Sequence, residues 1–125
     1  MTEVSRQQDI LRWAVDTFGA DAGSPEERAA RFLEEAVEAV QSSGLSRKIA
    51  ENVVKRVFDR PAGNQAQEIG AALVTLEALA ESLGISCAKA ADQEWERVRR
   101  IPPARFRRRH ERKACDGIVA AAPRE

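Results

Sequence analysis

Three glutamates, Glu34, Glu35 and Glu38, form an E-E-x-x-E pattern within an otherwise apolar stretch of the sequence. In an α-helix, with about 100° between successive residues, their side chains fall at roughly 0°, 100° and 40° around the axis. Like charges at this spacing repel by a few tenths of a kcal/mol per pair. A cation bound among the three carboxylates would remove this repulsion. A hard divalent metal ion, which prefers carboxylate oxygen, suits that role. The alternative is a solvated helix face that binds nothing.

The helix that carries these glutamates has a well-marked start. Ser24 can cap it, Pro25 suits its first position, and Glu27 completes a capping-box pattern. We therefore expect a helix over 25–42, closed by the turn that contains Gly44. Three of its apolar residues are expected to face a core: Leu33, Val37 and Val40.

Apolar residues at helical spacing predict further helices on both sides of this one. Their expected ranges are 4–18, 47–59 from a cap at Ser46, 65–83 and, from a cap at Ser86, about 87–100. The inner face of the helix over 47–59 is expected to consist of Ile49, Val53, Val57 and Phe58. After Pro102 and Pro103, the basic residues 105–113 are expected to form a short helix or an extended arm. The pattern predicts an all-α bundle of four main helices with a short basic C-terminal appendage, a single domain over 1–113 and a flexible tail over 114–125.

Composition restricts the class of protein. The chain has 125 residues, of which 43% are hydrophobic, 5% aromatic and 32% charged, which favours helices and one domain with a core. Its net charge is zero, so no global field attracts it to nucleic acid or membranes, although residues 97–113 are strongly basic. Cys87 and Cys115 lack metal-ligand spacing and are expected to be reduced thiols. With no apolar leader and no run of membrane-spanning length, we expect a cytoplasmic protein without membrane association.

A fourth carboxylate could complete the metal site. Glu68 lies in the first turn of the helix expected over 65–83, beside its apolar face. In an antiparallel helix pair this position can meet carboxylates of a facing helix, and the small neighbours Ala71 and Ala72 leave room for them. The simpler interpretation is that Glu68 only complements the helix dipole while Asn64 caps the helix.

Together these residues resemble the MazG-like superfamily of all-α nucleoside triphosphate pyrophosphohydrolases. That superfamily carries E-E-x-x-E on one helix and E-x-x-D on a later one. Here the first motif is Glu34-Glu35-Ala36-Val37-Glu38 and the second is Glu68-Ile69-Gly70-Ala71. The similarity covers about residues 6–100. It is greatest to the phage branch of dATP/dGTP pyrophosphohydrolases (MazZ-like), through Arg12-Trp13, the segment 28–35 and Val74-Thr75-Leu76.

The resemblance implies an activity and its cofactors. It implies hydrolysis of a purine deoxynucleoside triphosphate, dATP or dGTP, to the monophosphate and pyrophosphate with two or more Mg²⁺ or Mn²⁺ ions per site. The product dGMP could supply 2-aminoadenine synthesis in a phage-infected host cytoplasm. Glu34, Glu35, Glu38 and Glu68 would hold the metal ions, and Glu35 or Glu38 could also take a proton from the attacking water.

The second motif departs from the family pattern, because Ala71 stands where the aspartate is usual. Three outcomes follow. The four glutamates suffice together with water and substrate oxygens, which Mg²⁺ commonly accepts as ligands. Alternatively, Asn64 or another nearby oxygen replaces the aspartate. In the third case activity is weakened or lost, and the chain is a catalytically inactive relative.

Substrate contacts are less specific in the sequence than the metal ligands. Candidates for binding phosphate are basic residues near the two motifs: Arg31, Lys48, Lys55 and Arg56. Each of them could instead be a surface charge or the partner of a glutamate. Trp13 and Asn64 are the candidates for contacting the base, since an indole can stack on a purine, but Trp13 could equally be a packing residue.

Two classes of partner remain to be distinguished. Helices with apolar residues on several faces commonly bury the surplus against another copy, so we expect a homo-oligomer, a dimer or tetramer as in the superfamily. The alternative function is a non-catalytic helical module that binds nucleic acid or an acidic partner through residues 97–113. Nucleic acid is the less favoured partner, because this segment shows no interleaved aromatic residues and no groove-reading helix.

Overall fold

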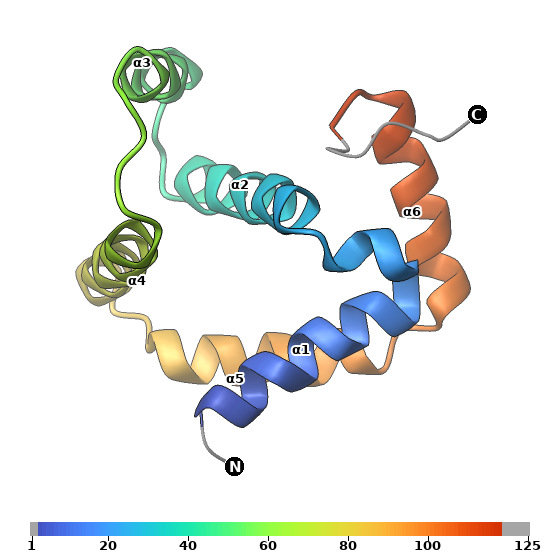
Figure 1. Cartoon of the computed structure of the whole chain (residues 1–125). Coiled ribbons are helices and arrows are strands. Elements are labelled where there is room, and N and C mark those ends of the chain that lie inside the picture. The colour runs from blue at the N-terminus through green and yellow to red at the C-terminus, as the bar shows by residue number, and fades with distance from the viewer. Residues whose placement is uncertain (1–2, 119–125) are drawn as a thin grey trace. The chain divides into compact units, whose positions relative to one another are not determined.

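The computed structural model describes residues 3–118, and these residues are helical with no strand. The α-helices are α1 (Glu3–Phe18), α2 (Pro25–Ser42), α3 (Arg47–Phe58), α4 (Gln65–Ser82), α5 (Cys87–Arg99) and α6 (Pro103–Cys115), and a short 3-10 helix, η1 (Ala20–Gly23), follows α1 (Figure 1). The all-α prediction is confirmed, and the expected helix ranges agree with these bounds to within a residue or two. The basic segment after Pro103 forms a helix rather than an extended arm.

Side-chain caps fix the starts of the four helices from α2 to α5. In each, an oxygen of the residue before the helix accepts a hydrogen bond from a backbone N–H three residues later, which satisfies one of the unpaired donors of the first turn. The caps and their donor–acceptor distances are Ser24 (3.2 Å), Ser46 (3.3 Å), Asn64 (3.0 Å) and Ser86 (3.3 Å). All four caps occupy the positions expected from the sequence.

Glycine closes α2 and α4 in the same way. Gly44 and Gly84 have φ angles of 91° and 70°, a left-handed conformation that side chains with a Cβ rarely adopt. The amide after each glycine donates back across the turn, from Leu45 to Val40 over 3.1 Å and from Ile85 to Ala80 over 2.9 Å. These are Schellman ends, and they stop the glutamate-bearing helix α2 where the sequence predicted.

The described chain divides into two compact units, and the first contains α1, η1, α2 and α6. Its small core lies where α6 packs against α1: the rings of Trp13, Phe18 and Phe106 meet edge to face in all three pairs, with centroids 5.4–5.9 Å apart. Phe106 is buried, as is Ala14 on the same face of α1 as Thr17. This aromatic cluster joins the C-terminal helix to the N-terminal one.

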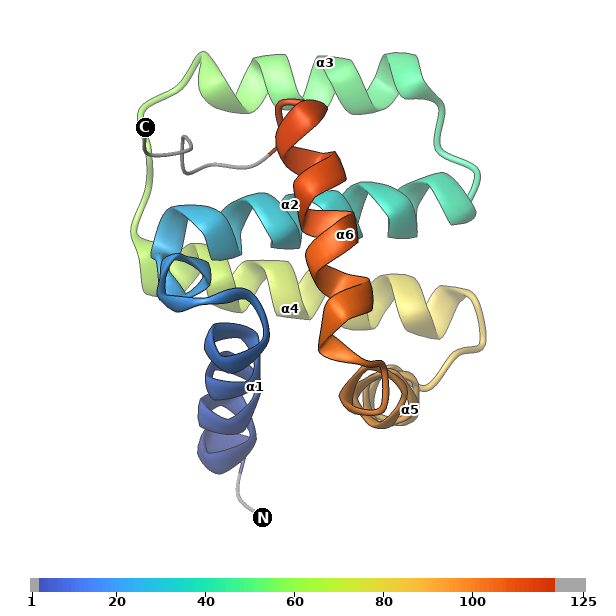
Figure 2. The same cartoon turned by 90° about the vertical axis from the view of Figure 1, so that its right-hand side faces the viewer.

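The second unit contains α3, α4 and α5. Helices α3 and α4 run in opposite directions (Figure 2), and α5 leaves α4 at a bend of 103°. Ala80 is buried at the end of α4, while neither α3 nor α5 has a buried residue. No single described helix is both long and apolar enough to cross a membrane; α4 and α5 taken together meet that criterion by length and composition only.

The predicted inner faces of α2 and α3 are corrected by the structure. Leu33 and Val37 on α2 are 50% and 44% exposed, and Val53 and Phe58 on α3 are 53% and 82% exposed. The apolar residues share a helix face as expected, but that face is open. The helical spacing correctly identified which residues lie together and gave no information on what covers them.

The predicted C-terminal tail begins inside a helix. Helix α6 continues to Cys115, two residues beyond the expected end of the domain at 113, and Gly117 follows in a turn. The remainder of that predicted tail, 119–125, lies outside the described residues. Since Lys113 belongs to α6, this helix end bears directly on the candidate site.

Candidate metal centre

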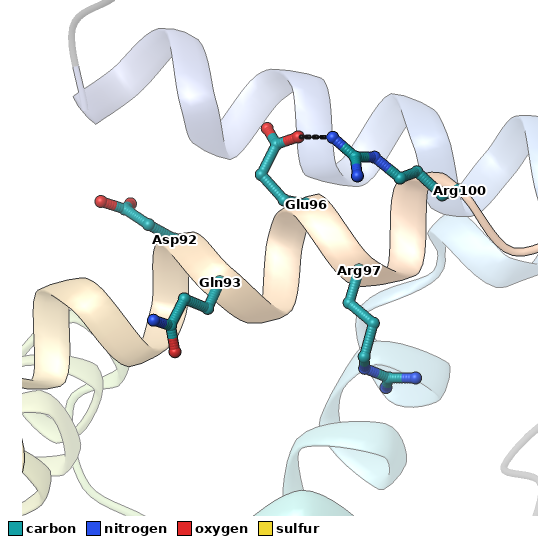
Figure 3. Close-up of a pocket in the computed structure, with 5 residues that line it drawn as sticks. All are labelled: Asp92, Gln93, Glu96, Arg97 and Arg100. Carbon is teal, nitrogen blue, oxygen red and sulfur yellow. Dashed lines mark ion pairs between the residues drawn. The ribbon is translucent and has the colours of Figure 1, made fainter.

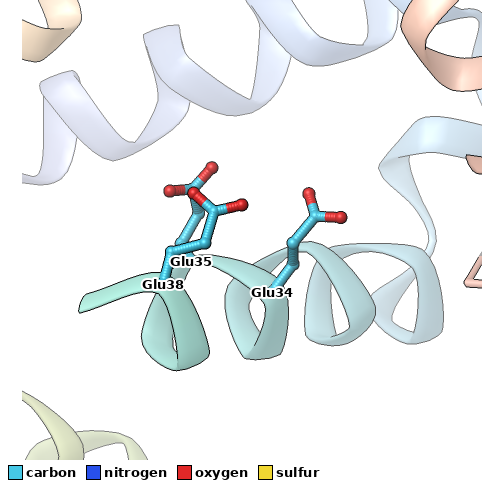
Figure 4. A group of neighbouring side chains, drawn as sticks. All are labelled: Glu34, Glu35 and Glu38. Carbon is cyan, nitrogen blue, oxygen red and sulfur yellow. The ribbon is translucent and has the colours of Figure 1, made fainter. Parts of the chain in front are cut away.

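The three glutamates of the E-E-x-x-E pattern come together on one side of α2 (Figure 4). One carboxylate oxygen from each of Glu34, Glu35 and Glu38 lies within 4.8 Å of the other two. Glu34 is half-buried, whereas Glu35 and Glu38 are exposed. Ligand oxygens on a single Mg²⁺ lie about 2.0–2.1 Å from the ion, so small side-chain rotations would bring this set around one cation. The donor set, consisting only of carboxylate oxygens, fits a hard divalent ion.

Two protein cations already contact Glu34. The Lys113 ammonium donates a hydrogen bond of 2.6 Å to Glu34 Oε1, joining α6 to α2. On the other oxygen, Arg31 Nη1 lies 3.6 Å from Glu34 Oε2, one helical turn before it. The most enclosed of the three carboxylates is therefore neutralised from both sides by its own chain.

Arg31 also pairs with a buried carboxylate at the start of α2. Glu27 is only 2% exposed, and its Oε1 lies 3.2 Å from Arg31 Nε. The neighbouring Arg28 is partly buried as well. Burial lowers the pKa of the Arg28 guanidinium; the charge of Glu27 opposes this shift and the charge of Arg31 adds to it. This end of α2 thus carries two guanidinium groups, Arg28 and Arg31, together with the first-turn carboxylates Glu26 and Glu27.

Glu68 lies at the start of α4, in the other unit. Its carboxylate folds back toward the preceding loop, where a Cβ added to Gly63 would come within 2.7 Å of Glu68 Oε1. The lack of a side chain at Gly63 therefore makes room for this carboxylate. Convergence of Glu68 with the glutamates of α2 stays a prediction.

Residues around the second motif have structural roles of their own. Asn64, a candidate for base contact, caps α4 by accepting from the Gln67 amide. At the position of the missing aspartate, the Ala71 carbonyl accepts a hydrogen bond of 2.9 Å from the Thr75 hydroxyl. The capping interpretation of Asn64 is confirmed, and its role at the base stays a prediction.

The candidate phosphate ligands divide between the two units. Arg31 lies in the first unit beside the glutamate cluster, and its pairing with Glu27 and Glu34 confirms that it partners glutamates. On α3, Lys55 pairs with Asp59 over 2.8 Å at an exposed position, and Lys48 and Arg56 are exposed. Of this set, the structure brings Arg31 to the cluster, and the phosphate contacts of the others stay predictions.

Trp13 takes part in packing. Its indole meets the rings of Phe18 and Phe106 edge to face at 5.9 and 5.4 Å, and it is half-buried between α1 and α6. The packing interpretation offered by the sequence is thereby confirmed. A role for Trp13 in stacking on a purine stays a prediction.

A shallow cleft along α5 (Figure 3) contains none of the predicted site residues. It is lined by Asp92, Gln93, Glu96, Arg97 and Arg100. Its charges largely pair along the helix: Arg100 lies 3.6 Å from Glu96, and Arg97 donates to Glu94 over 3.0 Å. The hydrogen bond from Arg97 lowers the pKa of Glu94.

Sequence reasoning missed Lys113 as a neighbour of the cluster and Glu27 as a buried ion-pair partner. For Glu27, the spacing to Arg31 at i,i+4 was a usable signal, since such pairs lie on one helix face. For Lys113 there was none, because 79 residues separate it from Glu34 and only the docking of α6 brings them together.

Comparisons with protein-family models, with curated proteins and with solved structures found no match for this chain.

Proposed function

We propose that the chain is a metal-dependent nucleoside triphosphate pyrophosphohydrolase of the MazG-like type, acting on purine deoxynucleoside triphosphates such as dATP or dGTP. The observation that supports it best is the cluster of three carboxylates, Glu34, Glu35 and Glu38, on one side of α2. Its spacing resembles the first motif of that superfamily, and its oxygens suit Mg²⁺ or Mn²⁺. Glu68 would add the ligand from α4 in the folded bundle.

Different residues of the chain would bind the metal ions, accept a proton and contact the phosphates. Glu34, Glu35, Glu38 and Glu68 would hold the divalent cations, which when bound neutralise the triphosphate and make a water more acidic. Glu35 and Glu38 are exposed, so one of them can reach a water and take its proton as the substrate is cleaved between the α- and β-phosphates. Arg31, held beside the cluster by Glu27, would place a fixed positive charge near the phosphates.

The proposal includes assembly into a dimer or tetramer. Helix α3 has no buried residue, and its apolar face is 43–53% exposed at Ile49, Val53, Val54 and Val57. On α4, Ile69 is 73% exposed and Leu73 is 49% exposed. Apolar surface of this extent normally marks a protein interface, and a second copy offers the same helices as a self-complementary partner.

The assay for the proposed function is direct. Purified protein is incubated with each dNTP and Mg²⁺ or Mn²⁺, and release of monophosphate and pyrophosphate is measured with and without EDTA. Metal-dependent release that E38Q abolishes and E26Q retains supports the proposal, because Glu26 lies on the same helix outside the cluster. Lack of turnover with every dNTP and both metals would exclude it.

The alternative function, a non-catalytic module that binds nucleic acid or an acidic partner, is supported by one observation. Among the described side chains of α6, these arginines are exposed: Arg105, Arg108, Arg109 and Arg112. A basic helix of this kind can bind nucleic acid or an acidic protein through phosphate or carboxylate contacts. Salt-sensitive DNA binding in a protein without turnover would favour this non-catalytic module.

A further inference from the structure

The contact between α6 and the glutamate cluster has a consequence for metal binding. Lys113 Nζ lies 2.6 Å from Glu34 Oε1, and both side chains are partly enclosed, with 30% and 21% of their surfaces exposed. An ammonium group at this distance occupies one acceptor site of that oxygen and places a positive charge where a metal ion would approach. Since Arg31 lies near the second oxygen of Glu34, a cation bound to either oxygen would lie beside a positive charge of the chain.

We propose that Lys113 competes with a divalent cation for Glu34, so that the docked α6 weakens metal binding at the Glu34/Glu35/Glu38 cluster. This inference rests on the proposed function, because it concerns the regulation of the same site. The metal can still contact the exposed Glu35 and Glu38 first. Coordination by Glu34 is then opposed by the charge of Lys113 and becomes more favourable when Lys113 moves away.

The aromatic cluster explains why this competition persists. Phe106 is buried against Trp13 and Phe18, so the first half of α6 stays attached to α1. Lys113 lies seven residues further along the same helix, near its C-terminal end. The ammonium is thus held close to Glu34 by packing elsewhere, which raises its local concentration above that of a free ion.

The test measures Mn²⁺ affinity by the electron paramagnetic resonance signal of the free ion, without substrate. K113Q should bind Mn²⁺ about two- to fivefold more tightly than the wild type, since ion pairs of this kind are worth roughly 0.4–1 kcal/mol. K113R keeps the charge and should stay near the wild type. R112Q removes an exposed charge from the same helix and should change the affinity by less than about 1.5-fold at 0.15 M salt.

The E34Q background shows whether the effect acts through Glu34. There, adding K113Q should leave the Mn²⁺ affinity unchanged. A second readout is amide hydrogen exchange in the last turn of α6, which should be faster with Mn²⁺ in the wild type, because coupling between two equilibria is reciprocal. Circular dichroism confirms that each variant is folded.

The outcomes separate the two proposals. If the wild type binds Mn²⁺ and K113Q binds it equally or more weakly, the proposed competition is wrong. The proposed function is unaffected by that result. Slower exchange of the last turn of α6 with Mn²⁺ would also overturn the competition. No Mn²⁺ binding by either protein at millimolar concentration would overturn both proposals.

Discussion

The packing of α6 on α1 can be tested by removing the Phe106 ring. Phe106 is 8% exposed and forms edge-to-face pairs with Trp13 at 5.4 Å and with Phe18 at 5.5 Å. Truncating a buried phenylalanine to alanine typically costs about 3–5 kcal/mol through lost transfer free energy and the cavity left behind. The two ring pairs contribute about 0.5–1.5 kcal/mol each within that total.

The core of the first unit is small, which places F106A at the lower end of this range. Among the described residues of this unit, the buried apolar ones besides Phe106 are the alanines Ala14 and Ala22, so neighbouring side chains can partly collapse into the space left by the ring. We therefore expect the free energy of unfolding to fall by about 3 kcal/mol. Because Phe106 anchors α6, we also expect F106A to release Lys113 from Glu34 and to strengthen Mn²⁺ binding as K113Q does.

The assay is urea denaturation monitored by tryptophan fluorescence, with F106L as the matched control. Leucine keeps most of the buried volume and loses the ring pairs, so F106L should cost about 1–2 kcal/mol. A loss below about 1 kcal/mol in F106A would refute the reasoning, because truncating a buried anchor should cost more than that. Equal losses in F106A and F106L would also refute it, because the apolar volume that leucine keeps would then contribute nothing. Unchanged Mn²⁺ affinity in F106A would show that Lys113 does not depend on the anchor.

Four further predictions concern single residues. E38Q should abolish Mg²⁺-dependent dNTP hydrolysis while its circular dichroism spectrum and melting temperature remain near those of the wild type; near-normal turnover would exclude the metal proposal. V53D should dissociate the oligomer in size-exclusion chromatography with light scattering, because it places a charge on the apolar face of α3, whereas K48D, outside that face, should not. N64A should lower the free energy of unfolding by about 1 kcal/mol through loss of the α4 cap, and N64D, which can still cap, should restore it. E94Q should cost about 0.3–0.5 kcal/mol at pH 7 by removing an exposed ion pair; because the pKa of Glu94 is lowered in the folded chain, that contribution is present above the unfolded pKa and should disappear as the pH falls through the folded one.

Local structure was predictable because its causes are local. The cap residues Ser24, Ser46 and Asn64 act on amides three positions away, and the glycine at the end of α2 acts within one turn. The glutamate cluster was predictable for the same reason, since a single helix fixes the angles between Glu34, Glu35 and Glu38.

The environment of the cluster was not predictable in this way. The contact between Lys113 and Glu34 depends on how α6 docks, and that docking is set by Phe106 meeting two rings of α1. No periodicity within α6 encodes its partner helix. Residues 105–113 are therefore predicted from the sequence to be an appendage, whereas in the structure Phe106 packs into the core.

The exposed apolar face of α3 connects the stability of the second unit with the proposed oligomer. On α3, Val53 and Val57 lie on one helix face, and each is about half exposed, at 53% and 47%. Leaving such side chains in water forgoes about 25 cal/mol for each Å² of apolar surface, so a partner that covers them gains a large hydrophobic contribution. If a second copy supplies that cover, assembly and folding of the second unit become one process, and its stability depends on protein concentration. Melting temperatures measured over a hundredfold range of concentration would reveal this coupling, and a value independent of concentration would exclude it.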